Sequence, residues 1–353
     1  MSAPLVISRY WARDAANPNM AIEELKLRLN ALDELPSHVT LVSAGEVFVL
    51  LDPLVIEFHQ WLSDHCQVTF ISAACTSLHA GILDFYHSDF SATVVISLDL
   101  NKLFQQSCLN SLGIGNDNTQ DGLDVVPGVG FIALKRSVVG KQLAPDELVV
   151  EKCQLLSQQP GMTGTQILIR QLYQELKYLP DHVLPVSFDI CANWAKSLLR
   201  GLDNQLAVNQ QTVNWLASIE SCQRHYLSLK PLFELQLYRQ KLKQNSLLLF
   251  TLGGGGRVGM LQLGKNSEAP IKLPEASFDH QCLVNDIDGY ELALSLLQGD
   301  KSAYYQQIRT TLKYPHSRYR GKENHYFKWQ THPSIEQTII KQAIRKKITG
   351  ANA

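Results

Sequence analysis

The chain lacks both an excess of charge and a long apolar run. Lys and Arg number 32 and Asp and Glu number 33 among 353 residues, so the formal net charge is −1. A chain without a basic excess has no global field for nucleic acid, which argues against nucleic-acid binding. No apolar run reaches the ~20 residues that a membrane-spanning helix needs. The sequence therefore predicts neither a nucleic-acid partner nor a membrane span.

The cysteines lack the patterns of a disulfide framework or a metal site. There are seven, an odd number, and no two form a CxxC pair. Scattered cysteines of this kind are typical of reduced thiols, and MSAPLVISRYWARD has no signal-peptide pattern. His280 and Cys282 follow Asp279, but no second pair has suitable spacing. We expect a cytoplasmic protein without a metal site.

What the chain does have is a regular alternation of strand and helix patterns up to about residue 264. Strands are predicted over 4–10, 38–45, 67–74, 92–99, 129–136 and 183–190, and a strand–turn–strand unit over 246–263. Helices are predicted over 19–35, 50–65, 76–88, 163–176, 193–202 and 229–242, with Asp52 capping the second and Pro53 beginning it. Alternating elements with buried strands predict an α/β fold with mixed sheets. A linker-like stretch then divides a domain over 1–264 from an extension over 265–353.

One cysteine stands at a junction that suits chemistry. In FISAACTSLHAG, Cys75 follows a predicted strand, precedes a predicted helix and has small neighbours. A helix N-terminus favours a thiolate, and its free N–H groups can stabilise an oxyanion. Free cysteine is also among the most buried residue types, so a packed corner is the other interpretation.

Two further features bear on this junction. His79 lies four residues after Cys75, so it shares a helix face with the thiol and is either a local base or a packed histidine. The run GGGGRVG (253–259) has no P-loop ending and precedes a strand. Its glycines, Gly253, Gly254 and Gly255, permit φ > 0 and close approach, so we interpret the run as a backbone turn beside the cysteine.

These segments resemble a known family. TFISAACTSLHAGILDFYHSDFSATVVISLD resembles the nucleophile region of the β-ketoacyl-(acyl carrier protein) synthases of the thiolase-like superfamily. DGLDVVPGVGFIALKR and LLLFTLGGGGRVGMLQL resemble two later motifs in the same order, so the resemblance covers about 38–263. It implies a layered α-β-α-β-α architecture with mixed sheets, a shortened N-terminal half and a small C-terminal extension. It also implies a dimer.

The chain departs from the family at the histidines. The synthases use one histidine in an HGTGT motif, which is absent here, and VLPVSFDICANW places Asp189 or Ile190 at that position. A variant HQAN pattern is echoed only by Ala192 and Asn193. The second histidine corresponds to His225, which is either catalytic or a helix-terminal histidine without a role. Asp189 and Asn193 are therefore auxiliary candidates, and Cys75 and His225 the principal ones.

The resemblance implies acyl chemistry on a thioester. Cys75 would accept an acyl group from a phosphopantetheine-linked donor, an acyl carrier protein or coenzyme A, for transfer or condensation in fatty-acid or polyketide-type metabolism. The alternative is a degenerate partner subunit, similar to a chain-length factor, that dimerises with an active synthase. The pairing would be a homodimer or a heterodimer. A basic and aromatic stretch over 313–329 suits an anionic partner, which is the phosphopantetheine or acidic surface of a carrier protein before nucleic acid, or it is a solvated tail.

Overall fold

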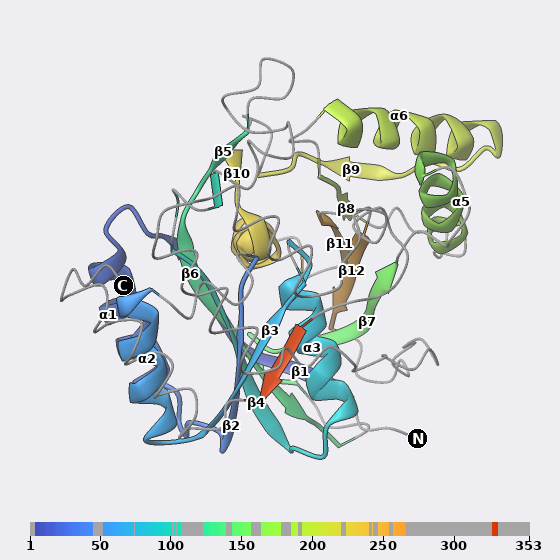
Figure 1. The fold of residues 1–353 in the computed structure, drawn as a ribbon. Coiled ribbons are helices and arrows are strands. Elements are labelled where there is room, and N and C mark those ends of the chain that lie inside the picture. The colour runs from blue at the N-terminus through green and yellow to red at the C-terminus, as the bar shows by residue number, and fades with distance from the viewer. Residues whose placement is uncertain are drawn as a thin grey trace.

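The computed structural model describes residues 4–44, 52–73, 75–100, 102, 105–106, 123–138, 143–156, 164–177, 185–189, 193–219, 224–239, 242, 246–253, 257–265 and 327–330. Helices and strands alternate through these segments up to Gly264, as the sequence predicts (Figure 1). Across the described ranges, every helix is too short or too polar to cross a bilayer.

Eleven strands form one mixed sheet in the order β13-β3-β2-β4-β6-β1-β7-β12-β11-β8-β9. Their bounds are β1 (Leu5–Asp14), β2 (His38–Val42), β3 (Gln67–Ser72), β4 (Ala92–Asp99), β6 (Gly128–Arg136), β7 (Leu148–Leu156), β8 (Pro185–Ser187), β9 (Asn214–Leu216), β11 (Leu247–Gly253), β12 (Arg257–Gly264) and β13 (Phe327–Gln330). β1 pairs with β7 at only two positions, Val6↔Val149 and Ile7↔Leu148. This short seam separates a first half (β13 to β1) from a second half (β7 to β9).

Alternate residues of each half face different apolar clusters. In β4, Val95 packs in a cluster with α3 (Ser77–His87) and α7 (Lys230–Tyr238), whereas Ile96 packs with α1 (Pro18–Asn30) and α2 (Pro53–Ser63). In β11, Leu249 faces α3 and α7, whereas Phe250 faces α5 (Gly164–Leu176) and α6 (Asn193–Val208). Strands with both faces apolar must be covered on both sides.

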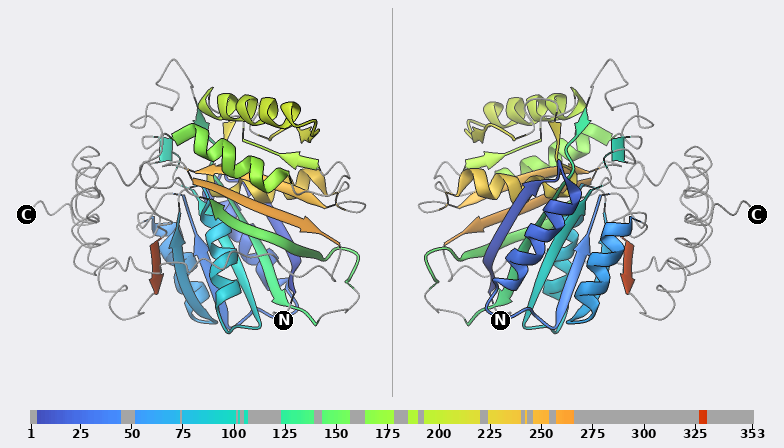
Figure 2. Two further views of the ribbon diagram at one scale, coloured as in Figure 1. Left: turned by 90° about the vertical axis from the view of Figure 1, so that its right-hand side faces the viewer. Right: turned by 90° about the vertical axis from the view of Figure 1, so that its left-hand side faces the viewer.

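The result is five layers. α1 and α2 cover the outer face of the first half, and α3 and α7 lie between the halves. α5 and α6 cover the outer face of the second half. Figure 1 places the two outer helix pairs on opposite sides of the molecule, and Figure 2 shows α5 and α6 stacked beyond the second half. The predicted α-β-α-β-α architecture with a mixed sheet is confirmed.

Local predictions differ in how well they match. Asp52 caps α2 by accepting the N–H of Leu54, and Pro53 is its first residue, as predicted. The first helix ends at Asn30 rather than at residue 35. The sequence pattern missed β7, because Glu151 and Lys152 interrupt its apolar run. Both find partners in the fold, since Glu151 accepts hydrogen bonds from neighbouring strands and Lys152 pairs with Glu175.

Part of the predicted C-terminal extension joins the main sheet. Of residues 265–353, the structure describes only Lys265 and β13. β13 runs antiparallel to β3 with Phe327 opposite Ser72, so it adds a strand at that edge. His280, Cys282 and most of the basic and aromatic stretch over 313–329 lie outside the described residues.

An arginine side chain closes the C-terminal end of the central helix α3. The Arg136 guanidinium lies 3.0 Å from the carbonyl oxygens of Phe85 and Tyr86, 2.5 Å from that of Ser88 and 3.0 Å from that of Phe90. The last carbonyls of a helix have no partner within the helix and carry partial negative charge, so a cation there stabilises it.

We expect Arg136→Met to lower the free energy of unfolding by about 1–3 kcal/mol, because it leaves several half-buried carbonyls without donors. Urea denaturation followed by circular dichroism measures this. The control is Arg28→Met, which removes an exposed ion pair with Glu24 and is expected to cost less than about 1 kcal/mol. Equal losses in the two variants would show that Arg136 does not cap the helix.

Candidate functional site

Cys75 lies between β3 and the central helix. It is two residues before the start of α3 and is 8% exposed. Thr76 holds the cap position without capping the helix, since its hydroxyl donates to the Ala73 carbonyl oxygen. The first-turn N–H groups of α3 have no partner within the helix, as at any helix start. Their partial positive charge is therefore available at the corner where Cys75 lies.

The fold brings His225 to the thiol from 150 residues away. His225 Nε2 lies 3.2 Å from Cys75 Sγ, and both residues are buried. His225 belongs to a two-residue strand, β10 (Arg224–His225), which runs parallel to β5 (Asp124–Val125). The N–H of Val126 donates to the His225 carbonyl oxygen at 2.9 Å. These backbone contacts fix the histidine main chain while its ring points at the sulfur.

A thiol and an imidazole at this distance can share a proton. The imidazole can take the thiol proton and leave a thiolate beside an imidazolium, which is the arrangement of an activated cysteine nucleophile. The surrounding apolar side chains belong to the cluster of the second half, which includes Cys75 itself, Phe188, Phe250 and Leu252. Water-poor surroundings strengthen the attraction between the two charges.

His79 lies elsewhere. Its ring packs against β12, where a Cβ on Gly259 would be only 2.6 Å from Nδ1. The ring is fully buried, and no described residue makes a hydrogen bond to either of its nitrogens. Burial, and secondarily the nearby charge of Lys230, lowers the pKa of His79 to about 3. An imidazole with so low a pKa is a weak base at neutral pH.

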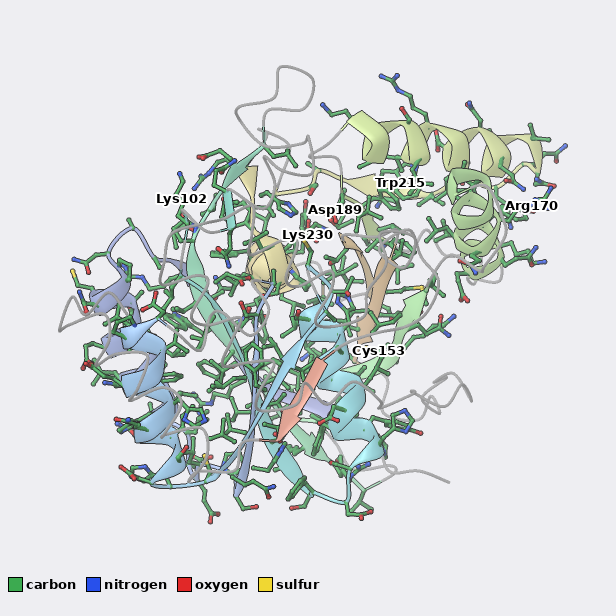
Figure 3. The ribbon with its side chains drawn as sticks, in the orientation of Figure 1. Lys102, Cys153, Arg170, Asp189, Trp215 and Lys230 are labelled. Atoms are coloured by element: carbon green, nitrogen blue, oxygen red, sulfur yellow. The ribbon has the colours of Figure 1, made fainter. Side chains whose placement is uncertain are left out.

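Asp189 takes part in a buried group of charges that the sequence did not reveal. Lys230 Nζ lies 3.1 Å from Asp189 Oδ1 and 3.2 Å from Glu234 Oε2, and all three side chains have no exposed surface. Figure 3 shows Asp189 and Lys230 together near the middle of the molecule. Lys230 also donates to the Phe250 carbonyl oxygen, and the N–H of Leu252 donates to Asp189 Oδ2. The cluster thus holds the end of β11, where the glycine run begins.

The remaining candidates are only partly described. Gly253 is the last residue of β11, and Gly254 and Gly255 lie outside the described residues. Asn193 is the first residue of α6, and its side chain lies outside the described part of the structure. The proximity of the glycine run to Cys75 therefore stays a prediction.

For two buried acidic residues, Asp99 and Glu234, the sequence gives a weak indication that the charge has a partner inside the protein. Asp99 ends an otherwise apolar strand, where a charge must find internal partners. Glu234 lies four residues after Lys230, the spacing of a helical ion pair. Neither pattern alone separates a buried charge from an exposed one.

Comparison with known proteins gives matches to solved structures only. No family model and no curated protein sequence matches the chain. A cerulenin-bound crystal structure of Xanthomonas campestris OleA is 11% identical with a TM-score of 0.48, over 74% of this chain and 97% of that one. An acetamide-bound OleA structure is 13% identical with a TM-score of 0.46, over 74% and 98%. With identities of 11–13% and TM-scores below 0.5, these two matches support no conclusion about the fold or the chemistry of this chain.

The buried His79 ring makes stability depend on pH. Because its folded pKa of about 3 lies below the ordinary 6.5, the unfolded chain binds a proton that the folded chain does not as the pH falls. Stability from this group is complete above pH 6.5 and is lost on acidification. We expect a loss of about 2 kcal/mol between pH 7 and pH 5.

Urea denaturation of the wild type and of His79→Leu at both pH values measures this contribution. The variant should lose about 2 kcal/mol less on acidification than the wild type, because leucine takes up no proton. His65→Gln, at an exposed histidine, is the matched control and should follow the wild type. The same pH dependence in His79→Leu would contradict the assignment.

The buried cation should matter far more than a surface one. Lys230→Met leaves Asp189 and Glu234 together in the interior without their counter-charge, so we expect a loss of about 3–5 kcal/mol in unfolding free energy. Lys26→Met removes the surface pair with Glu23 and should cost less than about 1 kcal/mol. Chemical denaturation compares the two, and similar losses would mean that the cluster is not electrostatically coupled.

Proposed function

We propose that the protein transfers acyl groups through a thioester on Cys75, with His225 accepting the thiol proton. The observation that carries the proposal is the buried contact of 3.2 Å between Cys75 Sγ and His225 Nε2. Seven cysteines are present, yet only this one combines a histidine partner with the start of a central helix among the residues described.

The proposed step balances without a cofactor. The Cys75 thiolate attacks the carbonyl carbon of an acyl thioester and forms a tetrahedral oxyanion. Collapse breaks the bond to the donor sulfur, and the donor leaves as a thiol that takes the proton held by His225. The products are an acyl-Cys75 thioester and a free donor thiol. We propose that the first-turn N–H groups of α3, which begins two residues after Cys75, stabilise the oxyanion.

Two other described cysteines, Cys66 and Cys153, differ from Cys75 in the groups around the thiol. Cys66 is more exposed than Cys75, yet burial raises its pKa to about 11 and its thiol donates to the Leu62 carbonyl oxygen. Burial raises the pKa of Cys153 still further. Neither thiol lies beside an imidazole nitrogen in the contacts of the described residues, so neither has a base to form the thiolate near pH 7.

The donor we propose is phosphopantetheine-linked, on coenzyme A or on an acyl carrier protein, in fatty-acid or polyketide-type metabolism. The resemblance places Asp189 or Ile190 at the position of the first synthase histidine, and the Asp189 carboxylate is committed to Lys230 and to the N–H of Leu252. An ionised carboxylate donates no hydrogen bond to a thioester carbonyl. We therefore propose acyl transfer to an acceptor, with slow or no decarboxylation of malonyl donors.

Intact-mass spectrometry after incubation with acyl-coenzyme A or acyl-carrier donors tests the proposal. We expect a covalent acyl adduct on the wild type and none on Cys75→Ala. His225→Gln should form the adduct about 100-fold more slowly or worse, the range for loss of a general base. Cys66→Ala is the matched control and should be acylated like the wild type.

Three results would count against the proposal. An adduct that persists in Cys75→Ala would place the chemistry on another residue. An unchanged rate in His225→Gln would remove the base. The absence of any adduct with every donor, together with co-purification of an active synthase, would support the non-catalytic partner subunit instead.

A further inference from the structure

His225 is carried on a segment with a strained backbone. Between His225 and α7 the chain makes a short 3-10 turn (Leu227–Leu229), in which Leu227 has a φ of 52°. The left-handed region is unfavourable for leucine, so such a residue persists only where the surroundings impose it. The next residue, Ser228, makes the contacts that can impose it.

Asp99 accepts hydrogen bonds from the main-chain N–H and from the hydroxyl of Ser228. Asp99 Oδ2 lies 3.0 Å from the Ser228 nitrogen and 2.6 Å from its hydroxyl oxygen. Asp99 is the last residue of β4 and has no exposed surface. A carboxylate that binds the main chain and the side chain of one residue fixes both the position and the orientation of that residue.

The other oxygen of the Asp99 carboxylate accepts hydrogen bonds from the loop after β2 and from Gln105. Asp99 Oδ1 accepts from the Ser43 hydroxyl at 2.8 Å, from the Ala44 N–H at 2.9 Å and from the Gln105 amide at 2.9 Å. Ser43 and Ala44 follow β2, which lies between β3 and β4 in the sheet. One buried side chain thus joins the loop after β2 to the segment that follows His225.

Ser77 completes the connection to the cysteine. Its hydroxyl donates to the Ser43 carbonyl oxygen at 2.8 Å and accepts the N–H of Ala73 at 2.7 Å. Ala73 and Ser77 stand two residues before and two residues after Cys75. Hydrogen bonds therefore run without a break from the flanks of the thiol, through Asp99, to the residue three positions beyond the imidazole.

Asp99 and the groups that donate to it form a hub, and its hydrogen bonds require an ionised carboxylate. Among the described residues, five groups contact Asp99 and all five donate to it, and only a carboxylate accepts on both oxygens. Burial raises the pKa of Asp99 and is the largest effect, whereas the hydrogen bonds from Ser228, Ala44 and Ser43 lower it. An asparagine would turn an NH₂ group toward one of the two sets of donors and lose at least that set.

We propose that Asp99 is a positioning residue, which acts through Ser228 to hold the His225 ring in contact with Cys75. A role of Asp99 in acyl transfer rests on the proposed function. The contact between the His225 ring and Cys75, which Asp99 maintains, does not depend on any acyl donor. Loss of the hub should let Leu227 relax toward an ordinary backbone conformation. The imidazole should then move away from the sulfur while the cysteine stays at its corner.

The test is the rate at which iodoacetamide alkylates Cys75, followed by peptide mass mapping at pH 7 and pH 9.5. For Asp99→Asn we expect the rate at pH 7 to fall about tenfold or more, toward that of His225→Gln, because no base takes the thiol proton. At pH 9.5 hydroxide removes thiol protons without an imidazole, so the difference between the variant and the wild type should be clearly smaller than at pH 7.

A double variant separates positioning from a general effect on folding. If Asp99 acts through His225, then Asp99→Asn with His225→Gln should be alkylated at the same rate as His225→Gln alone. A merely structural role would change the rate at both pH values and would add to the histidine effect. Ser228→Ala loses the hydroxyl contact and keeps the N–H contact, so its loss at pH 7 should be intermediate.

Leu62→Ala is the matched control for stability. Leu62 is buried in α2, in the outer layer, so the variant should unfold more easily and still be alkylated like the wild type at pH 7. A folded Asp99→Asn with the wild-type rate at pH 7 would overturn the proposal. If Asp99→Asn does not fold, an unchanged rate in Ser228→Ala overturns it.

The experiments distinguish failure of the positioning role of Asp99 from failure of acyl transfer through Cys75. Coupling between Asp99 and His225 in alkylation, without any acyl adduct, would leave the positioning role standing and remove acyl transfer. An acyl adduct formed at the wild-type rate by Asp99→Asn would do the reverse.

Discussion

Charges sealed inside the protein must be surrounded by partners of opposite polarity, and two of them organise this molecule. Asp99 gathers donors from the loop after β2, from Gln105 and from Ser228. Lys230 gathers acceptors from Asp189, Glu234 and the main chain of β11. Within the segment from His225 to Lys230, Asp99 holds Ser228, and the Lys230 side chain is held by Asp189 and Glu234. The contact between imidazole and thiol depends on that arrangement.

The central helix layer explains why such charges are buried at all. Nine consecutive residues of α3, from Ser77 to Phe85, are buried, because the two halves of the sheet enclose the helix. A helix covered on all sides brings its polar side chains into the interior as well, and His79 and Ser77 are examples. The same enclosure points the N-terminus of α3 at Cys75 rather than at water, and Arg136 closes its other end.

Local sequence patterns predicted the alternating elements and the capped α2, whereas the layers and the pairing of Cys75 with His225 were implied only by the resemblance to the synthases. Local patterns could not predict the hub or the charge cluster. Asp99 and Ser228 are 129 residues apart, and Asp189 could be placed only relative to an expected histidine. β7 was missed because its polar residues are satisfied by strands and helices distant in sequence. What the sequence hides is therefore the partner of each buried polar group, which is a property of the fold.

The separation between Cys75 and His225 has a consequence for how the protein folds. The two residues are 150 positions apart, and the stretch between them includes β4 and β6 of the first half and β7, β8 and β9 of the second, so their contact closes a long loop. Contacts of such high sequence separation are made late and make folding slow. A fragment that ends between the two residues would contain the cysteine without the histidine, or the histidine without the cysteine. Activation of this thiol by an imidazole therefore requires the segments that carry Cys75 and His225 to have come together.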